Sequence, residues 1–294
     1  MLTAPLKKGD VIGFAAPSWL ATPEGDAPIF EKMESLGYRV KAAKNLYASG
    51  WGYAASAEER AEDLNQLIAD DEVRMIFFGG GEGADDVLPL LDYEGAARHP
   101  KIWMSYSDGT SILNTIWSRT GMTTYYGQMP GLMPGISEYN LSQFRAFMEG
   151  RLPEAHVGNS QWRCLCPGQA EGLLTGGYLD NFLFISNVGW LKIPEGERVI
   201  LFLEDHEKYF SIEHESALLT RLEQSPIMRQ AAGIVFGHYS EPVNGHLLER
   251  LQRLGRKWNI PVAYCDDFGH GANHAILPIG VRCRLDVAGK LTYG

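Results

Sequence analysis

Short apolar segments alternate with helix-like segments through the first 130 residues, and this alternation is the strongest constraint on the fold. The apolar runs typical of buried strands are 11–18, 38–43, 74–81 and 101–106, and the helix-like segments are 24–37, 56–70 and 84–91. Ser56 and Glu59 have the spacing of a helix capping box. The alternation predicts an α/β fold in which a parallel sheet carries helices on both faces. Ligands bind beyond the carboxyl ends of such strands, which directs attention to the turns after Ala16, Phe78 and Tyr106.

The second half of the chain has a different organisation. The stretch MPGLMPGISEYN at 129–140 is rich in proline and glycine and is the best candidate for a linker. We therefore predict an N-terminal α/β domain at 1–130, a linker at 131–165 and a C-terminal domain at 166–294. Apolar runs at 198–205 and 233–239 alternate with helix-like segments, which predicts that the C-terminal domain is a smaller mixed α/β domain.

Composition argues against some classes of partner. The formal net charge of −10 disfavours nucleic acid and anionic lipid. Apolar residues make up 45% of the chain, so a core can form without a metal or a disulfide. The N-terminal segment has no basic stretch followed by a long apolar run, so we expect no signal peptide, no membrane span and a cytoplasmic location. The four cysteines lack the spacing of zinc ligands, so we expect no metal.

The segment KIWMSYSDGTSIL at 101–113 places Ser107 between a predicted strand and a predicted helix. Free N–H groups at the start of a helix favour a developing anion, which suits an attacking serine. The N–H of Asp108 is then the natural first oxyanion donor, and Gly109 is the small residue that a tight elbow needs. Ser105 replaces the first glycine of the G-x-S-x-G pattern. The alternative is that Ser107 simply caps the helix.

Four glycines follow the third predicted strand in FFGGGEGADD at 77–86. The backbone must turn sharply there and can lie open to a ligand. A second oxyanion donor, a phosphate cradle and a plain tight turn are the three interpretations. The segment lacks Gly-Lys-Ser/Thr, which disfavours a P-loop.

An acid and a histidine follow strands in the second half. Glu204 ends the apolar run RVILFLE, where a carboxylate can orient a histidine or begin a solvated loop. His270 lies between two glycines in CDDFGHGANHAILPIG and is a candidate general base. A metal site is the alternative at this segment, but the spacing of its acids and histidines matches no ligand signature. Those residues are Asp266, Asp267, His270 and His274.

These motifs, in this order, resemble the LD-carboxypeptidase family of serine peptidases, which includes the microcin C immunity peptidases. The resemblance runs through nearly the whole chain and is carried by LKKGDVIGFAAPS, FFGGGEG, IWMSYSDGTSILN, LFLEDHEKY and FGHGANHAILPIG. It implies that Ser107 is the nucleophile, His270 the base and Glu204 the acid, with Glu207 as the second choice for the acid. It also implies a C-terminal domain with a β-barrel-like sheet, a homodimer, and no cofactor or metal.

The resemblance further implies an oxyanion hole made by the backbone N–H groups of Asp108 and of one glycine in the turn, for which we choose Gly81. The chain departs from the family pattern near this site. Family members commonly carry Arg-Gly-Gly-x-Gly where this chain has residues 79–83, and a glycine where it has Ser105. The chain also has GGYL at 176–179 where cell-wall enzymes often have Gly-Gly-Asn-Leu. We name as substrate-binding candidates Gly80, Glu82, Gly83 and Ser105.

The substrate that the resemblance implies is a cell-wall tetrapeptide, cut at an L,D peptide bond so that D-alanine is released. Glu82 could then pair with the amino group of a diamino acid. The alternative is hydrolysis of peptidyl- or aminoacyl-nucleotide conjugates, as in the microcin immunity branch. Two further hypotheses are a peptide-binding protein without turnover and a nucleotide-binding module that uses the glycine turn.

Overall fold

The structure is a computed structural model that describes residues 1–294 except 51, 53 and 151. The chain forms two compact units, Met1–Arg151 and Leu152–Gly294. The division falls inside the segment 131–165 that the sequence predicts as a linker, and residue 151 of that segment lies outside the described residues. Along the described chain, no helix is both long and apolar enough to cross a membrane.

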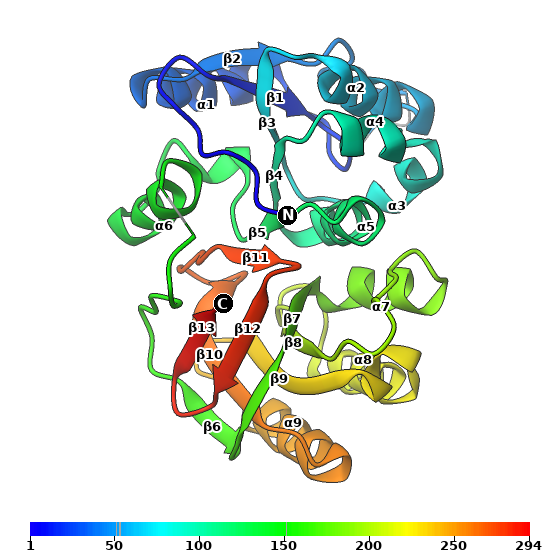
Figure 1. Cartoon of the computed structure of the whole chain (residues 1–294), viewed down its shortest axis with the longest axis vertical. Coiled ribbons are helices and arrows are strands. Elements are labelled where there is room, and N and C mark those ends of the chain that lie inside the picture. The colour runs from blue at the N-terminus through cyan, green and yellow to red at the C-terminus, as the bar shows by residue number, and fades with distance from the viewer. Residues whose placement is uncertain (51, 53, 151) are drawn as a thin grey trace. The chain divides into compact units, whose positions relative to one another are not determined.

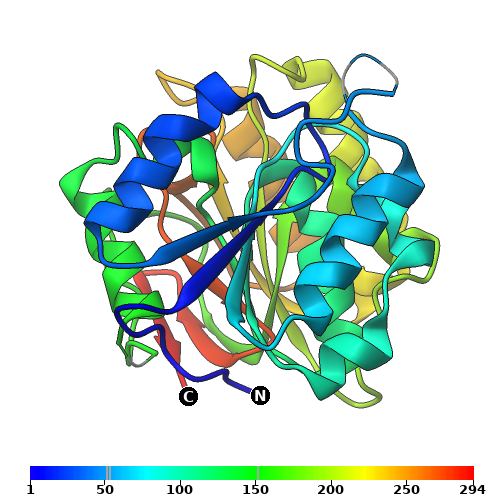
Figure 2. The same cartoon turned by 90° about the horizontal axis from the view of Figure 1, so that it is seen from above.

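The N-terminal unit contains a parallel sheet with strand order β5-β4-β3-β1-β2. The strands are β1 (Val11–Ala15), β2 (Arg39–Ala42), β3 (Val73–Phe78), β4 (Ile102–Ser105) and β5 (Thr124–Tyr126). The helices are α1 (Pro23–Ser35), α2 (Ala57–Ala69), α3 (Ala84–Val87), α4 (Tyr93–Arg98), α5 (Thr110–Thr120) and α6 (Glu138–Met148). α1 and α2 lie on opposite faces of the sheet (Figure 2). The predicted parallel sheet with helices on both faces is therefore confirmed.

Local sequence signals explain where these elements begin and how they pack. Ser56 and Glu59 form the predicted capping box at the start of α2. α6 lies in the segment that the sequence assigns to the linker, but it belongs to the N-terminal unit. Its Phe144 is fully buried, with its ring 6.4 Å from those of Phe77 and Tyr38. Burial of aromatic rings in this way fixes α6 on the core of the first unit.

The C-terminal unit contains a curled, mixed sheet with strand order β13-β12-β7-β8-β9-β10-β6 (Figure 1). The four strands β7 to β10 run parallel, and β6, β12 and β13 run antiparallel to their neighbours. These strands are β6 (Arg163–Cys166), β7 (Gln169–Tyr178), β8 (Val199–Glu204), β9 (Ala231–His238), β10 (Val262–Gly269), β12 (Arg282–Asp286) and β13 (Lys290–Tyr293). The short strand β11 (Leu277–Ile279) precedes β12.

Three helices cover one face of this sheet, namely α7 (Leu179–Asn187), α8 (Ile212–Gln224) and α9 (Gly245–Trp258). The mixed α/β architecture and the half-barrel curl agree with the predicted fold class. In both units the candidate residues follow the carboxyl ends of parallel strands. Ser107 follows β4, Glu204 ends β8 and His270 follows β10. This is the edge at which open α/β sheets bind ligands.

Candidate active site

Ser107 occupies a sharp elbow between β4 and α5. Its φ is 55°, in the left-handed region that residues with a side chain rarely adopt. The residue that caps α5 is Gly109, so Ser107 does not hold the capping position that was its alternative interpretation. Its backbone N–H donates to the hydroxyl of Tyr126 at 3.1 Å. A serine held in an unfavourable backbone conformation at a strand end is typical of a residue whose direction matters for function.

Two neighbours hold the elbow in place. The Asp108 carboxylate accepts the N–H of Ala84 at 2.8 Å, which links the start of α5 to the start of α3. Ser105 is fully buried and its hydroxyl donates to the carbonyl oxygen of Phe78 at 2.9 Å. A Cβ atom on Gly109 would lie 2.1 Å from the Ser105 hydroxyl oxygen, so position 109 requires a glycine. Ser105 therefore ties the elbow to the end of β3.

The glycine turn after β3 packs directly against Ser107. A Cβ atom on Gly80 would lie 2.7 Å from the Cβ atom of Ser107 and 2.9 Å from the carbonyl oxygen of Tyr106. Gly81 has a φ of 149°, and a Cβ atom there would lie 2.4 Å from the carbonyl oxygen of Ser18. Only glycine fits these two positions, so the backbone of the turn can approach the elbow closely.

The rest of the turn is fixed by its ends. The N–H of Glu82 donates to the carbonyl oxygen of Ser18 at 2.9 Å, while the Glu82 side chain is exposed. Gly83 has a φ of 105° and is the N-cap residue of α3. The turn is thus joined to the loop after β1 on one side and to α3 on the other.

Arg60 is a positioning residue that the sequence analysis missed. It is 4% exposed, and its guanidinium donates to the carbonyl oxygens of Pro17 and Gly83 and to the carboxylate of Asp86. The family pattern has an arginine within the glycine turn, whereas in this chain a buried arginine reaches the turn from α2. Its signal in the sequence was its spacing of four and seven residues from the buried Leu64 and Leu67 on one helical face.

We expect Gly80→Ala to reduce kcat by roughly 10²-fold, because the added methyl group would displace the Ser107 backbone by a fraction of an ångström or more. Gly135→Ala is the matched control, since nothing lies within 4 Å of a Cβ atom there. Steady-state kinetics with thermal unfolding curves for both variants measure the effect. Wild-type kcat in a folded Gly80→Ala protein would show that the turn does not set the position of Ser107.

In the C-terminal unit, Glu204 and His270 form a buried pair. The Glu204 Oε2 atom lies 2.8 Å from His270 Nδ1, and the carboxylate is completely buried. Burial lowers the pKa of His270, but the charge and hydrogen bond of Glu204 outweigh it, so the pKa lies above its ordinary value. A Cβ atom on Gly269 would lie 3.2 Å from that of Glu204, which explains the glycine before the histidine. By contrast, Glu207, the second choice for the acid, has an exposed side chain.

Aromatic rings surround the histidine. The ring centroids of Tyr178 and Tyr209 each lie 5.2 Å from that of His270, and Phe210 stacks on Tyr178 at 6.2 Å. Tyr178 is the residue that stands where cell-wall enzymes often have asparagine. Tyr209 is 53% exposed, so one face of this aromatic cluster is open to solvent.

Two further buried acids lie near Glu204. Asp205 and Glu215 are completely buried. Burial, followed by the charge of Glu204, raises the pKa of Asp205 to about 7, and burial also raises the pKa of Glu215 well above its usual range. Glu215 was not among the residues predicted from the sequence, and its signal there was its place three, four and seven residues before the buried leucines 218, 219 and 222 of α8.

The residues weighed as metal ligands have other partners. Asp266 lies 2.8 Å from His238 Nδ1, and Asp267 accepts from Trp162 and lies 3.0 Å from His156 Nε2. Outside residues 51, 53 and 151, no group of three or more histidine, cysteine or acidic side chains is arranged to hold a metal ion. The described residues therefore present a serine elbow in one unit and an acid–histidine pair in the other.

Comparison with known proteins identifies the family. The N-terminal domain of LD-carboxypeptidases matches residues 12–127 and their C-terminal domain matches residues 171–285. The chain belongs to the LD-carboxypeptidase family. It is therefore an enzyme of the serine peptidase class, and the predicted resemblance is confirmed.

Relatives in the LD-carboxypeptidase family match this chain over almost its full length. The Bacillus subtilis protein YocD, named as a carboxypeptidase, is 30% identical over 97% of this chain and 96% of its own. The microcin C7 self-immunity protein MccF of Escherichia coli is 28% identical over 99% of this chain and 94% of its own. A structure of MccF aligns with a TM-score of 0.85 at 25% identity, covering 100% of this chain and 98% of the other. The muramoyltetrapeptide carboxypeptidase of Oxalobacter formigenes has the same fold, with a TM-score of 0.79 at 23% identity over 96% and 97% of the two chains.

Proposed function

We propose that this LD-carboxypeptidase family member is a serine carboxypeptidase that cuts the L,D peptide bond of cell-wall tetrapeptides and releases D-alanine. The proposed triad is Ser107, His270 and Glu204. The hydrogen bond of 2.8 Å between Glu204 and His270 Nδ1 is the observation that carries the proposal. It fixes the neutral tautomer in which Nδ1 holds the proton and Nε2 can accept one.

In the proposed mechanism, His270 Nε2 takes the proton of the Ser107 hydroxyl as its oxygen attacks the carbonyl carbon of the L-residue. The N–H groups of Asp108 and Gly81 stabilise the oxyanion, each by roughly 3 kcal/mol in the transition state. The C–N bond then breaks, and His270 donates its proton to the departing amino group of D-alanine. Water attacks the resulting ester, His270 takes the water proton, and collapse of the second intermediate returns that proton to Ser107.

A relative and two local features support the choice of substrate. The Bacillus subtilis protein that is 29% identical over 97% of this chain is named a probable murein peptide carboxypeptidase. Glu82 is exposed in the glycine turn, where it is available to the amino group of a diamino acid. The N–H groups of Gly80 and Gly83 are further candidates for contact with the peptide. We also propose a homodimer, as the family resemblance implies, and a cytoplasmic location.

Hydrolysis of aminoacyl-nucleotide conjugates is the second candidate function. A specific observation favours it, since one matching structure is MccF in complex with aspartyl sulfamoyl adenosine. The aromatic rings of Tyr178 and Tyr209 beside His270 are suited to stacking on a base. This role competes with simple packing of the two rings around the histidine.

A paired mass-spectrometric assay separates the two functions. The substrates are L-Ala-γ-D-Glu-diamino acid-D-Ala tetrapeptides and an aminoacyl sulfamoyl adenosine. We expect loss of D-alanine from the tetrapeptide and an intact conjugate. Cleavage of the conjugate alone would assign the chain to the immunity-type activity, and cleavage of neither would overturn both proposals.

The pH dependence of kcat/KM should report the state of His270. The base must be neutral, and Glu204 raises its pKa, so activity should fall as the pH drops through an inflection above the value of about 6.5 for ordinary histidine. Burial raises the pKa of Asp205 to about 7, so the profile is also measured in Asp205→Asn. An inflection that persists in this variant belongs to His270, whereas an inflection that vanishes would assign it to the buried acid.

A further inference from the structure

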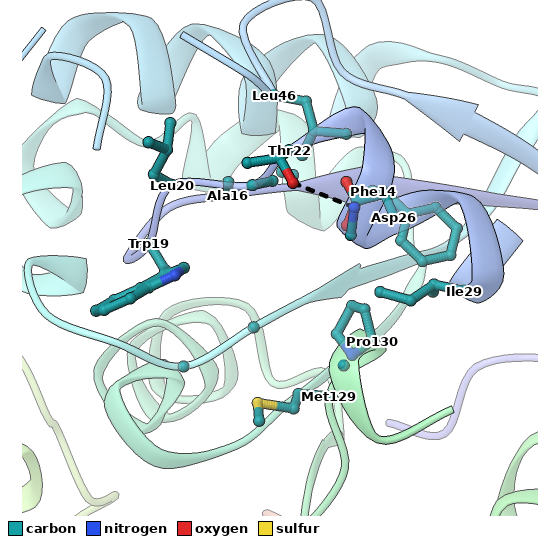
Figure 3. Close-up of a pocket in the computed structure, with 16 residues that line it drawn as sticks. Phe14, Ala16, Trp19, Leu20, Thr22, Asp26, Ile29, Leu46, Met129 and Pro130 are labelled. Carbon is teal, nitrogen blue, oxygen red and sulfur yellow. Dashed lines mark hydrogen bonds between the residues drawn. The ribbon is translucent and has the colours of Figure 1, made fainter. Parts of the chain in front are cut away.

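A cavity of about 510 Å³ lies in the N-terminal unit beside the glycine turn. It is bounded by the loop after β1, the first turns of α1 and the segment 129–131 (Figure 3). Its walls are mostly apolar, and the large side chains that form them are Phe14, Trp19, Ile29, Leu46, Met129 and Pro130. The volume is in the range of cavities that bind small molecules.

The cavity is adjacent to the proposed reacting serine. Gly79 and Gly80 form part of its wall, and Gly80 packs against Ser107 with no room for a Cβ atom between them. In the acyl-enzyme, the acyl residue is bonded covalently to Ser107, so its side chain lies beside the elbow. A cavity that shares a wall with the elbow is therefore placed to hold the side chain of the acyl residue.

The charge of the wall restricts what the cavity can hold. Among the sixteen residues that line it, Asp26 is the only charged one, and none is lysine, arginine or histidine. Asp26 is half-buried in the first turns of α1, close to Ile29 and Phe14 in Figure 3. A carboxylate on the ligand would lose water here without gaining a cationic partner, and Asp26 would repel it. An ammonium group would instead gain a charge-assisted hydrogen bond.

We propose that this cavity is the subsite for the acyl residue and that it selects an aliphatic side chain ending in an amino group without a carboxylate. Lysine has this chemistry, while diaminopimelate carries an additional carboxylate on the same carbon as its distal amino group. The apolar walls accept the methylene chain, and Asp26, which lines the cavity, binds the ammonium group in place of Glu82, which lies outside it. This inference rests on the proposed carboxypeptidase function and narrows it to lysine-type tetrapeptides.

Three tetrapeptides of the form L-Ala-γ-D-Glu-X-D-Ala test the proposal, with X being L-lysine, L-norleucine or meso-diaminopimelate. Norleucine keeps the aliphatic chain and lacks only the amino group. We expect wild-type kcat/KM to be about tenfold higher for lysine than for norleucine, and lower for diaminopimelate than for lysine. In Asp26→Asn the lysine-to-norleucine ratio should fall to about one. Glu31→Gln, an exposed acid of the same helix outside the cavity, should keep the wild-type ratio.

A binding measurement tests the proposal even if the Asp26→Asn protein does not fold, because it uses a variant that keeps Asp26. Calorimetry with the Ser107→Ala protein should give a Kd about tenfold lower for the lysine peptide than for the norleucine peptide. Equal ratios in wild type and folded Asp26→Asn, equal Kd values for the two peptides, or a preference for diaminopimelate would each overturn the assignment of the cavity. Absence of D-alanine release from all three peptides by wild type would instead overturn the carboxypeptidase function on which the inference rests.

Discussion

Replacing Ser107 with alanine should reduce D-alanine release by roughly 10⁴-fold or more. The hydroxyl oxygen is the proposed nucleophile, and without it no acyl-enzyme can form. The remaining groups, including the oxyanion donors, could then only assist direct attack by water. Residual catalysis by such groups is small in serine peptidases that lack one member of the triad.

Ser107→Ala should impair catalysis with little effect on the stability of the fold. Alanine removes the hydroxyl but keeps the Cβ atom that packs against Gly80, so the melting temperature should change by only a few degrees. Ser118→Ala is the matched control, because it removes a hydroxyl that donates a hydrogen bond to the carbonyl oxygen of Thr115 within α5. We expect its kcat to be close to that of the wild type. Substantial turnover by a folded Ser107→Ala enzyme would exclude the covalent mechanism.

Replacing Glu204 with glutamine should lower kcat by about 10³- to 10⁴-fold. The buried carboxylate holds the proton of His270 on Nδ1 and stabilises the imidazolium that forms during attack. A glutamine amide can present its N–H group to Nδ1, which favours the wrong tautomer and leaves no charge to offset the imidazolium. The pKa of His270 should also fall, because Glu204 is the group that raises it.

Glu207→Gln provides the decisive comparison for the acid. This side chain is exposed and three residues further along the loop, so we expect kcat within about twofold of wild type. Stopped or continuous assays of both variants at several pH values measure kcat and the inflection together. A large loss in Glu207→Gln with little loss in Glu204→Gln would exchange the roles of the two acids.

Much of the fold could be predicted from the alternation of segments. Apolar runs of four to eight residues followed by amphipathic stretches leave few solutions other than a parallel sheet covered by helices. The capping box at Ser56 even gave the start of α2 to within one residue. The sequence did not show that α6 packs on the N-terminal core, because the Pro- and Gly-rich stretch before it is equally typical of a linker.

The candidate site was predictable where chemistry-bearing residues follow strands. Ser107, Glu204 and His270 each stand at or just after a strand end, which the sequence shows directly. The choice between Glu204 and Glu207 depends on burial, which a pattern of consecutive polar residues does not reveal. Arg60, Glu215 and Asp26 lie on helices, and their surroundings are set by tertiary packing, so only their spacing relative to apolar residues indicated them.

Covalent labelling with a fluorophosphonate probe tests the central claim most directly, because it reports an activated serine without requiring the natural substrate. Wild-type enzyme should gain one phosphonyl group, which peptide mass spectrometry should place on Ser107. Labelling should be lost in Ser107→Ala and strongly slowed in Glu204→Gln. A wild-type protein that stays unlabelled, or carries the label on another serine, would contradict the assignment of Ser107 as the nucleophile.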